Sequence, residues 1–237
     1  MDRRRPHSAL SALSAQIIAC RRCPRLCAHL REVGARKKRE FASWDYWARP
    51  LPGFGDPDAR LLVVGLAPAA HGGARTGRMF TGDSSGNFLA RALWRAGFAS
   101  QPISVTRDDG LALRDAYITA AARCAPPDNK PLPEELARCR PYLLHELALL
   151  ARVRVIVALG KIAWDATLRA AREAGWHLPA RRPEFAHAAE VDLARPSRAR
   201  VLLVGSYHPS RQNTNTRRLT EIMFDRVFTR ARAAAAD

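Results

Sequence analysis

Two short apolar runs that end abruptly in loops of small and polar residues constrain the fold of this chain most. The first run, residues 61–65, leads into a loop rich in Gly and Pro that carries His71 and, further on, Asp83. The second run, residues 201–205, leads into a loop that carries His208. Such runs are typical of buried parallel strands, which deliver the loops that follow them to one edge of a sheet. We therefore expect both loops to meet in one cleft at the carboxyl ends of a parallel sheet.

The rest of the chain alternates between helical and strand patterns. The patterns predict helices over residues 8–19, 84–96, 133–150, 161–174 and from about 217 onward, with further strands at 117–119 and 153–159. This alternation predicts a three-layer α/β/α fold with a central, mainly parallel, four-stranded sheet. We expect residues 1–237 to form a single domain, with a helix and a basic, aromatic loop in 1–57 and an irregular insertion at 175–199.

The net charge of the chain limits the kinds of molecule that it can be expected to bind. The chain has 39 Lys and Arg residues against 22 Asp and Glu residues, which gives a formal net charge of +17. Because arginine-rich composition does not by itself create such an excess, we expect a polyanionic partner, and nucleic acid is the best candidate. No apolar run reaches membrane-spanning length and no signal peptide is recognised. A cytoplasmic protein without a membrane partner is expected, and a monomer, since no heptads occur.

The cysteines form the next candidate site. The chain has five, an odd number that argues against a disulfide framework in a protein without a signal peptide. Cys20 and Cys23 have the C-x-x-C spacing of a metal-binding pair, and Cys124 and Cys139 can complete a four-thiolate set that joins the N-terminal segment to the sheet. Four cysteines alone fit either zinc or a [4Fe–4S] cluster. Cys27 is interpreted as a small buried hydrophobic residue.

Two long motifs resemble those of one enzyme family. Residues 65–72 (GLAPAAHG) and 75–83 (RTGRMFTGD) resemble motif A of the family 5 (type b) uracil-DNA glycosylases, and residues 208–216 (HPSRQNTNT) resemble their motif B. The four cysteines and residues 124–131 are similar as well. The resemblance implies a monofunctional DNA glycosylase of base excision repair with a structural [4Fe–4S] cluster, which favours iron–sulfur over zinc. Its substrate would be DNA that contains uracil or other deaminated bases.

The chemistry of glycosidic cleavage assigns roles to particular side chains. The nucleotide must leave the duplex, and Phe80 stands where the family stacks the base. His208 is the candidate donor to the base oxygens, which gain negative charge. Asp83 is the candidate group that orients the water, with Asn129 as a second polar group, although Asp83 could instead cap the helix that begins at Ser84. The role of His71 stays open.

The remaining site residues follow from the same resemblance. Residues 117–121 carry alanine where uracil-strict relatives place an asparagine, which predicts a broader range of bases, including hypoxanthine, xanthine and etheno-cytosine. The substrate-binding residues are expected to be Gly65, Ala67, Pro68, His71, Phe80 and Ser210. The DNA-binding residues are expected to be Lys130, Arg211, Gln212, Asn213, Arg217 and Arg218.

An alternative from a different class remains at this point. A non-catalytic iron–sulfur protein that binds nucleic acid or senses redox state would also need the cysteines and the positive charge. Such a protein would have no need for a histidine loop that faces a carboxylate loop. The geometry of His208 and Asp83 therefore distinguishes the two hypotheses.

Overall fold

The fold is built on one six-stranded sheet. The computed structural model describes residues 4–236, so Met1, Asp2, Arg3 and Asp237 lie outside the described part of the chain. In the order β1-β3-β2-β4-β6-β5, the strands are β1 (Phe54–Gly55), β3 (Ala116–Ala120), β2 (Leu61–Gly65), β4 (Val155–Leu159), β6 (Arg200–Ser206) and β5 (Glu190–Ala194). The four central strands are parallel, and β1 and β5 add antiparallel edges. The expected parallel core is confirmed, but the expected total of four strands is wrong.

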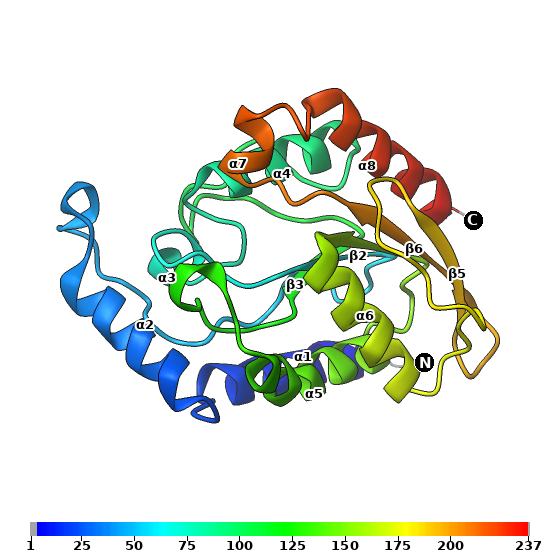
Figure 1. Cartoon of the computed structure of the whole chain (residues 1–237), viewed down its shortest axis with the longest axis horizontal. Coiled ribbons are helices and arrows are strands. Elements are labelled where there is room, and N and C mark those ends of the chain that lie inside the picture. Colours follow the sequence, from blue (N-terminus) through cyan, green and yellow to red (C-terminus); the bar gives the residue numbers. More distant parts are fainter. Residues whose placement is uncertain (1–3, 237) are drawn as a thin grey trace.

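Helices cover both faces of the sheet. Helices α1 (Arg4–Ile18), α5 (Pro133–Leu149) and α6 (Lys161–Glu173) lie on one face, and α4 (Ser84–Arg95) and α8 (Glu221–Ala236) lie on the other (Figure 1). This arrangement confirms the three-layer α/β/α prediction. Among the described residues, no helix is long and apolar enough to cross a membrane.

The central strands are buried on both faces, which is why their sequences read as continuous apolar runs. Along β2, Leu61 and Val63 pack in the core beneath α4 and α8, whereas Leu62 and Val64 pack in the core beneath α5 and α6. All four side chains are fully buried. The loops after these strands consequently leave the sheet at its carboxyl edge, where the cleft was expected.

The N-terminal segment contains a helix that the sequence patterns did not predict. Helix α2 (Pro24–Arg36) begins directly after Cys23, with Pro24 at its first position, and projects beyond the edge of the sheet (Figure 1). Proline is well tolerated at this position because the first turn of a helix has no acceptor for its N–H group. The short 3₁₀ helix η1 (Arg39–Phe41) follows. Only the part after residue 41 is the expected irregular, aromatic loop.

Several other boundaries differ from expectation. The insertion at 175–199 is not wholly irregular, because it contributes β5 to the edge of the sheet. Short helices interrupt the loops: α3 (Gly73–Thr76), η2 (Pro127–Asn129) and α7 (Arg211–Asn215). The last helix begins at Glu221, since Arg217 has a left-handed backbone (φ 56°) that ends the preceding turn.

Candidate active site

The loops after β2 and β6 meet at the carboxyl edge of the sheet. The ring centroids of Phe80 and His208 are 5.9 Å apart, with the ring planes inclined by 31°. The Phe80 ring also lies on Gly65, where a Cβ atom would come within 2.7 Å of the ring. The geometry therefore brings Gly65, Phe80 and His208 together, as the sequence predicted.

Phe80 has a backbone conformation that is unusual for a large side chain. Its φ angle is +49°, in the left-handed region that non-glycine residues avoid. Gly86 permits this conformation, because a Cβ there would collide with the carbonyl group of Phe80. Strain of this kind persists where the surrounding structure enforces it, and it is concentrated at functional sites.

His208 is held as a neutral imidazole. It is enclosed closely enough that desolvation lowers its pKa to about 4. The side-chain amide of Asn213 donates a 2.8 Å hydrogen bond to the carbonyl oxygen of His208, which fixes the loop. A neutral imidazole can donate one hydrogen bond to an oxygen acceptor without the cost of a buried positive charge.

Asp83 caps a helix and is partly buried in the loop beside Gly72. Its Oδ1 accepts a 2.8 Å hydrogen bond from the N–H group of Gly86, so Asp83 is the N-cap of α4. Burial raises the pKa of Asp83, opposed by backbone hydrogen bonds from Gly86 and Ser85 and by the charges of Arg211 and Arg75. A carboxyl group with a raised pKa is a stronger base once ionised, so the capping role does not exclude a catalytic one.

His71 faces the N-terminal aromatic segment. Its Nδ1 lies 3.0 Å from the hydroxyl oxygen of Tyr46, and burial lowers its pKa. The neighbouring Gly72 lies against Asp83, because a Cβ at Gly72 would collide with the Asp83 carboxylate. The segment around His71 therefore forms one wall of the space that Asp83 occupies.

The other predicted substrate-binding and polar residues are placed as follows. Ala67 and Pro68 lie in the loop directly after β2, and Pro68 packs against Gly73. The hydroxyl group of Ser210 caps α7 by accepting a 3.4 Å hydrogen bond from the N–H group of Asn213. Asn129 is exposed in η2, with a left-handed φ of 56°.

The predicted DNA-binding residues lie in two exposed segments. Lys130, Arg211, Gln212, Arg217 and Arg218 are exposed to solvent. Arg211 joins the two loops, because its Nε donates to the Ser84 hydroxyl at 3.2 Å. Arg218 lies over the ring of Tyr207, 4.7 Å from its centroid. The Asn213 amide already binds the His208 carbonyl, so in this conformation it supports the loop from within.

The cysteines lie near one another between the N-terminal helices and the sheet. Cys20 follows α1, Cys23 precedes α2, Cys124 follows β3 and Cys139 lies in α5. Burial raises the pKa of Cys124, and the charges of Cys139, Cys27, Cys20 and Cys23 raise it further, which shows that all five thiols share one region. Cys23, Cys124 and Cys139 are buried.

Four of these thiols, those of Cys20, Cys23, Cys124 and Cys139, form an all-sulfur donor set. Within residues 4–236, no three Cys, His, Asp or Glu side chains are close enough to hold one metal ion. The all-sulfur donor set suits a [4Fe–4S] cluster or a structural zinc ion.

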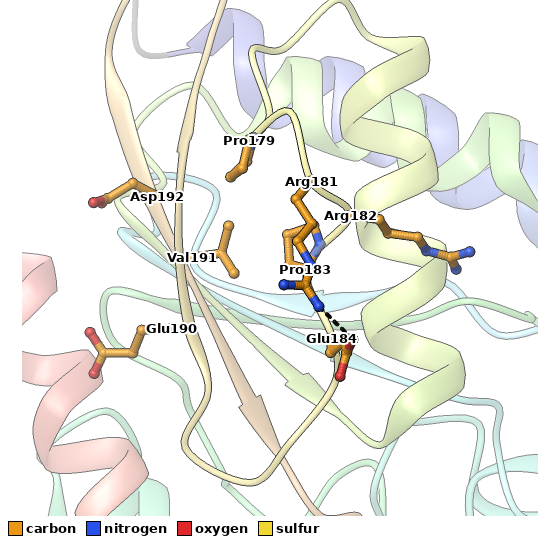
Figure 2. A pocket seen from close by; sticks show the side chains of 8 residues that line it. All are labelled: Pro179, Arg181, Arg182, Pro183, Glu184, Glu190, Val191 and Asp192. Carbon is orange, nitrogen blue, oxygen red and sulfur yellow. Dashed lines mark hydrogen bonds and ion pairs between the residues drawn. The ribbon is translucent and has the colours of Figure 1, made fainter.

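A separate cavity lies away from these residues. It has a volume of about 480 Å³ and opens between the segment 179–184 and β5 (Figure 2). Its lining includes the exposed ion pair of Arg181 and Glu184, with a 3.4 Å separation, and none of the residues predicted for catalysis or metal binding. We therefore locate the candidate active site at the carboxyl edge of the central strands.

The fold has three α/β/α layers, and a histidine loop and a carboxylate loop lie at the carboxyl edge of its parallel strands. This arrangement is typical of α/β enzymes whose site is at the strand ends. The chain belongs to the uracil DNA glycosylase superfamily, whose family profile matches residues 52–232. It is 52% identical to a type-5 uracil-DNA glycosylase of Thermus thermophilus, over 92% of this chain and 95% of that protein. It is 48% identical to the type-5 enzyme of Mycobacterium leprae, over 96% of each chain. It is also 34% identical to a type-4 enzyme of Archaeoglobus fulgidus, over 48% of this chain and 49% of that protein.

Two residues near the cleft were missed by the sequence reasoning. Tyr46 contacts His71, and Arg75 reaches the loops on both sides of Asp83. Arg75 lies inside the motif that carried the resemblance, but nothing in its sequence context distinguishes a buried arginine from a solvated one. Only its burial, with 3% of the residue exposed, marks it as part of the site.

Proposed function

We propose that this protein excises uracil and related deaminated bases from DNA by hydrolysing the N-glycosidic bond. The observation that carries the proposal is the neutral His208 ring beside Phe80. The Arg211–Ser84 contact joins it to the loop that holds the partly buried Asp83. Type-5 uracil-DNA glycosylases share 46–52% of their residues with this chain over more than nine-tenths of its length. The net charge of +17 suits a DNA substrate.

The proposed reaction divides the work between the two loops. The target nucleotide rotates out of the duplex, and its base stacks on Phe80. As the glycosidic bond breaks, negative charge develops on the base, and the His208 imidazole stabilises it by donating a hydrogen bond to a base carbonyl. The ionised Asp83 orients a water molecule toward the sugar carbon and accepts its proton. Asn129 is the second polar group proposed for the water.

The end of β3 supports a broad range of bases. Ala120 and Ala121 are buried there and offer only methyl groups, and the Thr119 hydroxyl donates a 2.7 Å hydrogen bond to Glu146. These side chains therefore supply no amide that would pair with the edge of uracil. A site without such a partner discriminates weakly between bases. Duplexes that contain deoxyinosine should also be cut, and complete specificity for uracil would contradict this part of the proposal.

For the cysteines we propose a structural [4Fe–4S] cluster held by Cys20, Cys23, Cys124 and Cys139. When bound, the cluster would cross-link the N-terminal helices to the sheet. The raised pKa of Cys124 means that its thiol must lose a proton to become a ligand, so assembly releases protons. The α1–α2 corner is held against α5 by the packing of Leu13 and Ile17 on Tyr142 and by the Arg25–Glu135 ion pair.

The direct test uses a labelled duplex with one deoxyuridine, incubated with the protein and then treated with hot alkali. We expect strand scission only after alkali, which means base removal without lyase activity. A matched duplex with thymine at the same position serves as the control. No scission, together with retained DNA binding, would favour the non-catalytic nucleic-acid-binding protein instead.

A further inference from the structure

Arg75 occupies an unusual position for an arginine. Only 3% of it is exposed, and its guanidinium carbon lies 3.8 Å from the ring centroid of Phe41 and 4.0 Å from that of Trp44. These two rings are nearly perpendicular, at 76°, so they form a corner around the guanidinium group. A buried arginine is costly unless its donors are satisfied, so its hydrogen bonds indicate what it does.

Its hydrogen bonds go to backbone on both sides of the Asp83 carboxylate. Nε donates to the carbonyl oxygen of His71 at 2.7 Å, and Nη2 donates to the carbonyl oxygen of Gly82 at 2.8 Å. His71 precedes Gly72, which lies directly against the Asp83 carboxylate, and Gly82 precedes Asp83 itself. One planar group therefore connects the two backbone segments that enclose this carboxylate.

No carboxylate among the described residues forms an ion pair with Arg75. Its Nη1 is buried and has no hydrogen-bond partner among the described residues. Desolvation lowers the pKa of Arg75, while Tyr46, Asp83 and Glu40 oppose this effect through space. The positive charge of Arg75 is stabilised by the ring faces of Phe41 and Trp44, which attract cations. The negative charge of Asp83 stabilises it further through space.

We propose that Arg75 is a positioning residue that holds the Asp83 carboxylate in place, and that Phe41 and Trp44 fix Arg75 for this purpose. The proposal deepens the proposed function and rests on it. It gives the N-terminal aromatic segment a role in the reaction through the contacts of Phe41 and Trp44 with Arg75. A small displacement of a catalytic group is enough to lower a rate by about 100-fold.

The charges that face Asp83 come from two elements. Arg211 from α7 and Arg75 from α3 lower its pKa, as do the N–H groups of Ser85 and Gly86 from the first turn of α4. Removing the Arg75 charge should therefore move the pKa of Asp83 upward. The acidic limb of the pH–rate profile should then move to higher pH, because Asp83 must be ionised to orient water.

The experiment compares Arg75→Met, Arg75→Lys and a control, Arg107→Met, in single-turnover cleavage of a deoxyuridine duplex across pH. Arg107 is an exposed arginine that lies over Trp47, 5.2 Å from the ring centroid, so its loss tests the general effect of removing a charge. We expect Arg75→Met to lower the rate by about 100-fold and to shift the acidic limb upward. Arg75→Lys should lower the rate but leave the acidic limb of the pH–rate profile at the same pH, because the positive charge is kept. Arg107→Met should change neither the rate nor the position of this limb. The Kd for uncut DNA should change less than the rate in both Arg75 variants.

A second variant tests the corner even if Arg75→Met fails to fold. Trp44→Leu removes one ring, and amide hydrogen exchange over residues 71–83 should then accelerate in the free protein while exchange in β2 stays unchanged. Hydrogen exchange does not depend on glycosylase activity. An inactive wild-type protein would therefore contradict the proposed function, while the exchange result would still test the role of Trp44. Wild-type rates and pH profiles in folded Arg75→Met, or unchanged exchange in Trp44→Leu, would overturn the proposal.

Discussion

At the scale of single residues, Asp83 combines two roles that sequence reasoning had set against each other. Its Oδ1 caps α4, yet the same carboxyl group is partly buried and has a raised pKa. A cap accepts one hydrogen bond through one oxygen, and the carboxylate has a second oxygen. The capping role is confirmed, and the catalytic role stays a prediction that a conservative substitution can separate from it.

We expect Asp83→Asn to keep the cap and abolish most of the activity. Asparagine is as good an N-cap as aspartate, and the substitution removes a desolvated charge, so the melting temperature should not fall. The rate of base release should fall by about 100-fold or more, as for the loss of a general base. Thermal unfolding and single-turnover cleavage measure the two effects.

The pH dependence gives an internal check on this variant. Because the pKa of Asp83 is raised in the folded protein, wild-type activity should decrease as pH falls through that raised pKa, and this limb should vanish in Asp83→Asn. Asp83→Ala is the matched control, since it loses the cap as well, at a cost of about 1 kcal/mol. A fully active Asp83→Asn would mean that the residue only caps α4.

At the scale of elements, the candidate cysteine ligands come from parts of the chain that also pack against one another without a cluster. Cys20 and Cys23 flank the corner between α1 and α2, whereas Cys124 and Cys139 belong to the sheet and to α5. A fully buried ion pair between Arg123 and Glu146 links the two latter elements independently of any cluster. Arg25 of α2 likewise pairs with Glu135 of α5, and Leu13 and Ile17 of α1 pack against Tyr142. Both halves of the site are therefore held by protein contacts, and a cluster would add to them.

Two serine substitutions should distinguish a cysteine that binds the proposed cluster from a cysteine that only lies near it. Cys139→Ser should lower the iron content and destabilise the N-terminal helices, because a structural metal contributes directly to folding free energy. Cys27→Ser is the matched control and should keep its iron, since we interpret Cys27 as a packing residue. Iron analysis and protease sensitivity of residues 20–36 measure the outcome. Loss of iron in Cys27→Ser with retention in Cys139→Ser would contradict this assignment.

At the scale of the whole molecule, the net charge of +17 should dominate the affinity for DNA. Each phosphate contact releases counterions, so the logarithm of the binding constant should fall linearly with the logarithm of salt concentration. Lys130→Ala should reduce the slope by about 1 if Lys130 contacts a phosphate. Arg181→Ala, in the cavity near β5, should leave the slope unchanged. Equal slopes in the wild type and Lys130→Ala would remove Lys130 from the interface.

The agreement between prediction and structure follows the strength of each local signal. Residues 61–65 and 153–159 were recognised as strands because strands buried on both faces are continuously apolar. Strand β5 was missed because it is an edge strand with alternating exposure, inside a segment rich in Pro and Arg. Helix α2 was missed because its basic residues masked a narrow buried stripe of Leu26 and Leu30.

The sequence by itself determined the layered fold, the two loops at the carboxyl edge and the types of residue that they carry, because periodicity and local motifs are properties of short segments. Only the tertiary structure decided that Asp83 is both a helix cap and a partly buried carboxyl group with a raised pKa. It also decided that the Asn213 amide supports His208 and that Arg75 lies between the rings of Phe41 and Trp44. The physical reason is that burial and hydrogen bonding depend on neighbours from distant segments, and desolvation sets the pKa of His208 and Asp83 only after these segments have packed.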